Sequence, residues 1–116
     1  MVRRVSLLQQ LITVGASAVT VTSAIAVNMI RDVYMLKASE KSGSPNVLYI
    51  DGVLGATVTT VDRLKMAGNE VESWGDPVNE LSFPIWRFEQ ALYDHIQLTA
   101  LAATIDVYIQ YADEHA

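Results

Sequence analysis

The sequence predicts a mainly α-helical protein, in which two long apolar helices form a helical hairpin and a β-hairpin region joins them as an elbow. Residues 5–30 contain no charged side chain. Residues 83–112 repeat apolar side chains at helical spacing. Between them, residues 46–75 carry turn signals flanked by short β-favouring runs. We therefore expect a single domain, residues 1–116, with helices at about 3–38 and 83–112.

The first segment requires a choice between helix and strand. Residues 18–23, AVTVTS, alternate as a strand does, but strands seldom exceed about ten residues. As a helix, residues 5–30 would be about 39 Å long. Small residues recur in it at four-residue spacing, which lets helices of neighbouring subunits approach closely. The two rows are Ala16, Thr20 and Ala24, and Ala18, Thr22 and Ala26.

The middle of the chain predicts a β-hairpin after a loop at residues 39–46. Asp51 and Gly52 stand between the apolar runs at 47–50 and 53–61. Asp-Gly is a strong signal for a two-residue hairpin turn, because both central residues of a type I′ turn need positive φ. We expect the turn at these two residues.

A second hairpin is predicted at Gly68 and Asn69. A two-residue turn there would place Lys65 opposite Glu72, an attractive cross-strand pair. The alternative is a short helix over residues 61–67 that Gly68 ends. The hairpin is the favoured interpretation, but both remain open.

The last segment is predicted to be an amphipathic helix with a wide apolar face. Ser82 can cap it, and Pro84 is tolerated in a first helical turn. Two helices cannot bury two wide apolar faces by themselves, so neighbouring copies or lipid must cover them. The residues that we expect to pack between subunits are Phe88, Leu92, Ile96, Leu101 and Ile105.

Composition also indicates a protein whose surface is covered by a partner. Charged residues make up 18% of the 116 residues, below the usual quarter, although small proteins have a high surface-to-volume ratio. The chain has no cysteine, which excludes disulfides and thiolate sites. The apolar start fits a secretory signal peptide, but we expect it to stay in the working protein, because the sequence includes it from Met1.

Positive charge is concentrated towards the amino terminus. Residues 1–41 carry a net charge of +3, and residues 42–116 carry −8. The first part could therefore face nucleic acid, although basic residues also flank membrane segments. The candidate nucleic-acid contacts are Arg3 and Arg4, followed by Arg31, Lys37 and Lys41.

No catalytic or metal-binding pattern stands above background. His95 follows Asp94 directly, and adjacent residues on a helix do not face each other. The carboxylates and histidines lack a metal-ligand spacing, and the glycines form no phosphate loop. We expect a protein that is not an enzyme and that has neither a metal nor a cofactor.

The predicted order of helix, β-hairpin elbow and helix over nearly the whole chain resembles the coat proteins of rod-shaped and bacilliform archaeal viruses, of the clavavirus type. The resemblance rests on layout and includes no signature motif. It implies a small helical hairpin that stacks helically around double-stranded DNA.

We therefore expect a structural protein that self-assembles into a helical shell, as the major coat protein of a virion. Its partners would be copies of itself and double-stranded DNA bound by the basic amino terminus. The alternative is a single-span membrane protein in contact with lipid, such as an accessory subunit of a membrane complex, or a pilin-like filament subunit. The charge-free first segment motivates this alternative.

Overall fold

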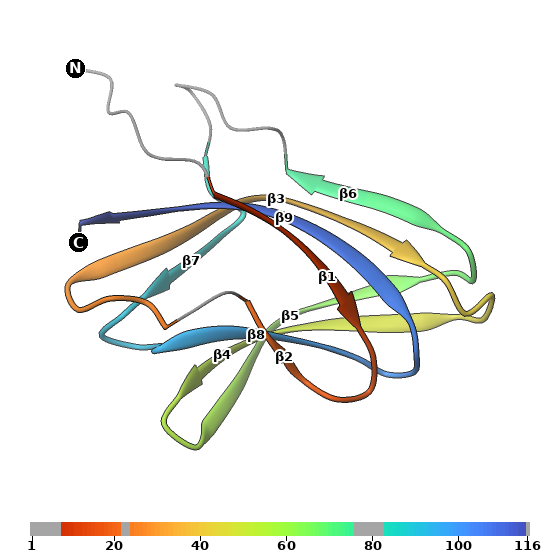
Figure 1. The fold of residues 1–116 in the computed structure, drawn as a ribbon, viewed down its shortest axis with the longest axis horizontal. Coiled ribbons are helices and arrows are strands. Elements are labelled where there is room, and N and C mark those ends of the chain that lie inside the picture. The colour runs from red at the N-terminus through yellow and green to blue at the C-terminus, as the bar shows by residue number, and fades with distance from the viewer. Residues whose placement is uncertain (1–7, 22–23, 76–82, 116) are drawn as a thin grey trace.

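The protein is a sandwich of two antiparallel β-sheets in the computed structural model, which describes residues 8–21, 24–75 and 83–115 (Figure 1). This part of the chain contains strands and turns but no helix. It therefore also has no helix that is long and apolar enough to cross a membrane. The prediction of a mainly α-helical hairpin is wrong.

Sheet A forms one layer and has the strand order β1-β9-β3-β6. A short fifth strand, β7, pairs with the first part of β3 on the same side as β6. The strands are β1 (Leu8–Val14), β3 (Met29–Glu40), β6 (Val71–Gly75), β7 (Trp86–Glu89) and β9 (Ile105–His115).

Sheet B forms the other layer and has the order β2-β8-β4-β5. In this sheet β4 pairs with β5 on one side and with β8 on the other. The strands are β2 (Val19–Thr20), β4 (Asn46–Leu54), β5 (Thr57–Met66) and β8 (His95–Ala100).

The chain passes repeatedly between the two layers (Figure 1). Strands β1 and β3 lie in sheet A, whereas β2, β4 and β5 lie in sheet B, and the first strand pairs with the last. Two four-stranded sheets connected in this alternating way have the topology of a jelly roll. The short β7 is an addition to that pattern.

The segment predicted as the first helix forms two strands and part of a third. In β1, Ile12 and Val14 face the core while Leu11 and Thr13 point outward, and this period of two belongs to a strand. A bend at residues 15–17 separates β1 from β2. The length of the charge-free run was therefore a misleading reason to predict a helix, because the run contains several short strands rather than one long element.

The segment predicted as the second helix forms β7, β8 and β9. In β9 the side chains of Ile105, Val107, Ile109 and Tyr111 are buried, and the residues between them are only partly covered. Turns at residues 90–94 and 101–104 interrupt the segment. The apolar residues fit both periods, and the tertiary pairing between distant strands selects the period of two.

The first predicted hairpin exists, but its turn lies four residues later than expected. Asp51 and Gly52 are inside β4, and the two-residue turn is Gly55-Ala56, between Leu54 and Thr57. Gly55 has φ +60°, as the first position of a type II′ turn requires. Gly52 serves packing instead, since a Cβ there would overlap the Tyr93 ring.

The second predicted turn is confirmed, but the strands that it joins do not pair. The chain reverses at Gly68 and Asn69, and the amide of Glu70 donates to the carbonyl of Ala67 at 3.2 Å. Residues 61–66 belong to β5 in sheet B, which rules out the alternative helix there, while β6 pairs with β3 in sheet A. This turn therefore crosses from one layer to the other.

The core lies between the two layers and is filled from alternate positions of the strands. Aliphatic residues dominate it, as expected where two sheets pack about 10 Å apart. Its largest fully buried apolar side chains are Phe88, Leu36, Leu48, Ile50, Ile96, Leu98, Ile105 and Ile109.

Candidate functional site

The sides of the sandwich are the least covered part of its backbone. Each sheet ends in two edge strands, and in the described residues no strand pairs with their outer sides. Strands β1 and β2 form one side, since the bend at residues 15–17 connects them directly. Strands β5 and β6 form the other side, with β7 continuing the edge of sheet A. An unpaired edge presents free N–H and C=O groups that can accept another strand.

The two sides each combine a long edge with a short one. Strand β1 has seven residues and β5 has ten, whereas β2 has two and β6 has five. Proteins commonly protect their edges with short strands and with charged side chains. The short length of β2 and the acidic Glu72 in β6 fit that pattern.

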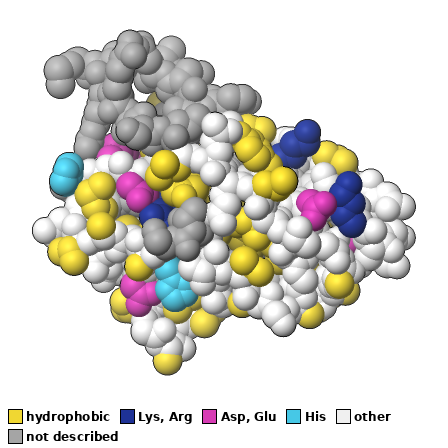
Figure 2. Space-filling view, viewed as in Figure 1, with side chains coloured by type: hydrophobic (Ala, Val, Ile, Leu, Met, Phe, Trp, Pro, Cys, Tyr) yellow, Lys and Arg dark blue, Asp and Glu magenta, His cyan; other side chains and the backbone are white. Residues whose placement is uncertain are grey.

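Such protection is absent from β1 and from the first half of β5, whereas the second half of β5 carries Asp62, Arg63 and Lys65. Strand β1 carries no charge, and neither do residues 57–61 of β5. Aliphatic side chains protrude from both: Leu11 is 75% exposed on β1, and Val58 is 51% exposed on β5. Figure 2 shows hydrophobic side chains reaching the surface in several clusters, with few charged groups between them. The edges β1 and β5 therefore combine unpaired backbone groups with exposed aliphatic side chains, as an interface does.

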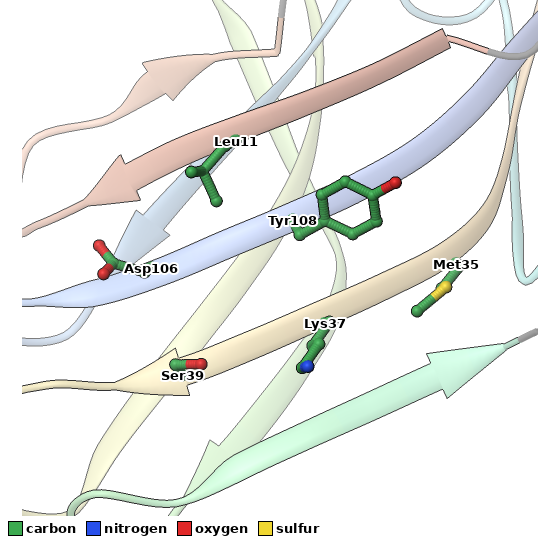
Figure 3. Close-up of a pocket in the computed structure, with 6 residues that line it drawn as sticks. All are labelled: Leu11, Met35, Lys37, Ser39, Asp106 and Tyr108. Atoms are coloured by element: carbon green, nitrogen blue, oxygen red, sulfur yellow. The ribbon is translucent and has the colours of Figure 1, made fainter. Parts of the chain in front are cut away.

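A groove of about 390 Å³ lies on the outer face of sheet A (Figure 3). Its lining comes from β1, β9 and β3, and consists of Leu11, Met35, Lys37, Ser39, Asp106 and Tyr108. The hydroxyl of Thr13 donates to Asp106 at 3.1 Å, and Gln110 donates to the Tyr108 hydroxyl at 2.8 Å. Tyr108 in turn donates to the side-chain oxygen of Gln9. Leu11 lines the groove and is also part of β1. The groove therefore adjoins the β1 edge.

Charged groups at the end where β3 begins are paired inside the fold. Arg31, with a side chain 3% exposed, donates to both carboxylate oxygens of Asp113 at 2.7 and 2.8 Å and lies 5.0 Å from the centre of the Tyr111 ring. The buried Asp32 accepts two hydrogen bonds from Arg87, and these raise the pKa of Arg87 above its usual value. This end is therefore held together by ion pairs.

A second polar cluster holds the end where β3 finishes. Glu40 accepts hydrogen bonds from the Asn46 side chain at 2.9 Å and from Ser42 and Gly43 at 2.8 Å. The bond from Asn46 is the main reason why the pKa of Glu40 falls to about 2. Asn46 also donates to and accepts from the backbone of Ala102. The loop at 41–45 is thereby attached to the loop at 101–104.

The only histidine–carboxylate contact that the described residues form serves a turn. Asp94 accepts from the backbone amide of Gly55 at 2.8 Å and lies 2.5 Å from Nδ1 of His95. The Gly55 bond is the first cause that lowers the pKa of Asp94, and His95 is the second. The expectation that these neighbours would not meet assumed a helix and was wrong. No group of three or more metal-ligating side chains occurs in the described ranges.

Two of the predicted nucleic-acid contacts, Arg31 and Lys37, lie in different environments. Arg31 is buried in its ion pair, and Lys37 stands on the outer face of sheet A in the groove. Arg3 and Arg4 lie outside the described residues. Arg31 is therefore unable to reach DNA without breaking the fold.

The residues predicted to pack between subunits are separated by the strand fold. Phe88, Ile96 and Ile105 belong to the core of the single chain, whereas Leu92 and Leu101 are exposed on turns. Five members of the small-residue rows are exposed around β2, and Thr22 lies outside the described residues. Those five are Ala16, Ala18, Thr20, Ala24 and Ala26. The rows are therefore not helix-packing surfaces.

Comparisons with known proteins add one likeness. No family model matches the chain, and no curated protein matches it. A solved structure described as "Bacillus endospore appendages form a novel family of disulfide-linked pili" aligns over 99% of this chain and 93% of its own, with 13% identity and a TM-score of 0.47. A likeness at this level does not establish a shared function. The present chain has no cysteine.

The helical layout behind the prediction of a DNA-packaging viral coat protein is wrong. That prediction depended on a helical hairpin, and the described residues form strands throughout both predicted helices. The sequence analysis missed the sheet edges, and the signal that could have found part of them was the alternation in AVTVTS at residues 18–23.

Proposed function

We propose that this protein is a structural subunit that self-assembles into a filament by pairing the free sheet edges of successive copies. The observation that carries the proposal is the pair of long, weakly protected edges, β1 in sheet A and β5 in sheet B. Strand addition to an edge satisfies backbone hydrogen-bonding groups that otherwise depend on water. The exposed Leu11 and Val58 would lose water at the same time.

The geometry of the edges favours an open polymer. Strands β1 and β5 belong to different sheets and to opposite sides of the sandwich. A contact between two different surfaces of the same subunit is heterologous, and it generates a ring or an open filament rather than a closed dimer. Each added subunit leaves one edge free for the next.

A non-enzymatic role is part of the proposal. Most of the polar contacts described above hold turns and ends of the fold: Arg31 with Asp113, Glu40 with Asn46, and Asp94 with Gly55. These groups are occupied by the fold itself. The low charge content of 18% fits a surface that other copies cover.

Charge insertion at the edges tests this function. Purified protein is examined by negative-stain electron microscopy and sedimentation, in parallel with Leu11→Lys, Val58→Lys and the matched control Leu101→Lys. Leu101 is 62% exposed but lies on the turn at 101–104 and belongs to neither long edge strand. We expect filaments from the parent and from Leu101→Lys, and loss of sedimenting material from both edge variants, because a lysine protects an edge.

Two results would contradict the proposal. One is a parent protein that stays monomeric over a wide range of concentration and salt. The other is normal filaments from both edge variants. Circular dichroism melts accompany the assay, and all three substitutions should leave the midpoint nearly unchanged, since each replaces an exposed side chain.

A further inference from the structure

We propose that successive subunits are stacked side by side with a half-turn between them, so that β1 of one copy pairs with β5 of the next while β2 pairs with β6. This inference rests on the proposed function and adds the geometry of its interface.

The directions of the four edge strands follow from the pairing within one subunit. Strands β1 and β3 are both antiparallel to β9, so they run the same way. The chain reverses between β3 and β4 and again between β4 and β5, so β5 also runs with β1. Strands β2 and β6 run the opposite way, since β2 and β4 are both antiparallel to β8 and β6 is antiparallel to β3.

A half-turn makes both edge contacts antiparallel. The axis of this rotation lies parallel to the sheets and across the strands, so the rotation exchanges the two layers and reverses each strand. It places β5 of the second copy beside β1 of the first, and β6 beside β2. Antiparallel pairing is slightly more stable per residue than parallel pairing. Stacking without the half-turn would also be antiparallel, but it would join β1 to β6 and β2 to β5.

The lengths of the edges distinguish the two arrangements. With the half-turn, the seven residues of β1 meet the ten of β5, and the two of β2 meet the five of β6. Without it, β5 would meet only the two-residue β2, and most of its outer backbone groups would gain no partner. Because unpaired buried backbone groups are costly, the matched arrangement is favoured.

The side chains indicate a register in which Leu11 stands opposite Val58. Leu11 belongs to the outer face of sheet A, where it pairs with Tyr108 of the groove. Val58 pairs with Val53 on the outer face of sheet B. The half-turn brings these two faces to the same side. In this antiparallel register Leu8 then stands opposite Val61, so the exposed aliphatic side chains of the two edges meet each other.

The same register supplies a partner for a buried polar atom. The side-chain oxygen Oε1 of Gln10 is buried and accepts no hydrogen bond within the described ranges of a single copy. Gln10 stands opposite Ile109 on the inner face of sheet A. Across the proposed interface it faces Thr59, whose hydroxyl can donate to an amide oxygen. A buried acceptor without a partner is uncommon in folded proteins, and assembly would satisfy this one.

Cysteine pairs test the arrangement directly, because the chain has no cysteine of its own. The double variant Leu11→Cys with Val58→Cys is assembled under reducing conditions, checked for filaments by electron microscopy and then oxidised. We expect a ladder of covalent oligomers on a non-reducing gel. The control pair Leu11→Cys with Ser73→Cys reports the arrangement without the half-turn, and each single-cysteine variant should remain monomeric on the gel.

The outcomes separate this inference from the proposed function. A ladder from the Ser73 pair but not from the Val58 pair would overturn the half-turn while filaments still form. Filaments in which neither pair forms a ladder would overturn it as well. A parent protein that forms no filament would overturn both proposals.

A second measurement examines the register without cysteines. Thr59→Val removes the hydroxyl that would donate to Gln10 and should raise the critical concentration for assembly about fivefold, the effect of one neutral hydrogen bond. Thr57→Val is the matched control, since Thr57 would face the aliphatic Ile12 and should change little. Equal effects of the two substitutions would show that the register is wrong.

Discussion

Polar groups are hydrogen-bonded within the subunit at the ends of this sandwich, whereas backbone polar groups along its sides lack a partner strand in the part of the chain that the structure describes. At one end Arg31 pairs with Asp113, and at the other Glu40 and Asn46 bind each other and the adjoining loops. Along the sides, no other strand in the described residues pairs with the free side of the long edge strands β1 and β5. Buried polar groups are satisfied within the subunit at the ends, whereas the backbone groups of the sides are left to water or to another copy.

The difference shows where the sequence places its few charges. A buried charge is stable only when it is paired and hydrogen-bonded, and the ends meet that condition. Strand β1 and residues 57–61 of β5 instead carry no charge and are rich in Val, Thr and other uncharged residues, and Val and Thr favour strands. The ends should therefore control the stability of one subunit, and the sides should control association.

The largest expected effect is at the end that holds Arg31. Arg31→Ala leaves the Asp113 carboxylate without its partner in a largely buried site, and removal of one partner from a buried pair costs about 3–5 kcal/mol. Urea unfolding followed by circular dichroism measures it. Lys37→Ala is the control, since Lys37 is exposed on the sheet face and should change the unfolding free energy by less than about 0.5 kcal/mol. Similar losses from both variants would contradict this account of the end.

A somewhat smaller loss is expected at the opposite end. Asn46→Ala removes the side chain that joins Glu40 to the backbone of Ala102. Buried groups left without partners cost about 1–3 kcal/mol each. Because the loops are exposed, water can replace part of the lost hydrogen bonding. We therefore expect the free energy of unfolding to fall by about 2–3 kcal/mol. Gln97→Ala, in the middle of β8, is the control and should lie within about 0.5 kcal/mol of the parent. Neither substitution should prevent filament formation below the melting temperature.

The pH dependence of stability refines the comparison further. The pKa of Glu40 is about 2 in the folded protein and 4.5 as an ordinary carboxyl. The unfolded chain therefore binds the proton first, and the stabilisation by Glu40 is present above about pH 4.5 and is lost as the pH falls towards 2. Melting temperatures between pH 5 and pH 2.5 measure the slope. Glu40→Gln should flatten it, whereas Glu89→Gln, on the exposed part of β7, should leave it unchanged.

Local signals were read correctly in the middle of the chain. The loop predicted at 39–46 is present at 41–45, and the strand that follows it and the reversal at Gly68 and Asn69 are confirmed. Each depends on a few adjacent residues with strong turn or strand preferences. The Asp-Gly turn was misplaced because Gly52 is required by the Tyr93 ring rather than by a turn, and that requirement comes from a residue far along the chain.

The two predicted helices failed for a physical reason of a different kind. Apolar residues such as Phe88, Ile96 and Ile105 recur at intervals that fit a helical stripe, but they also fit alternate positions of strands. Only the pairing of β8 with β4 and of β9 with β1 and β3 decides between them. The edge strands could not be predicted for the same reason. A strand is an edge only when no other strand pairs with one of its sides, and this depends on the pairing of the whole sheet.

The pairing of β1 with β9 also has a consequence for how the chain acquires its shape during synthesis. Strand β1 completes its ladder only with residues 105–111, so the sheet edge that it provides does not exist until those residues have been made. Folding dominated by such distant contacts is slow, and domains generally fold as units during or after translation. A nascent chain that still lacks β9 therefore presents no finished β1 edge, and the proposed polymerisation would have to wait until β9 has been synthesised.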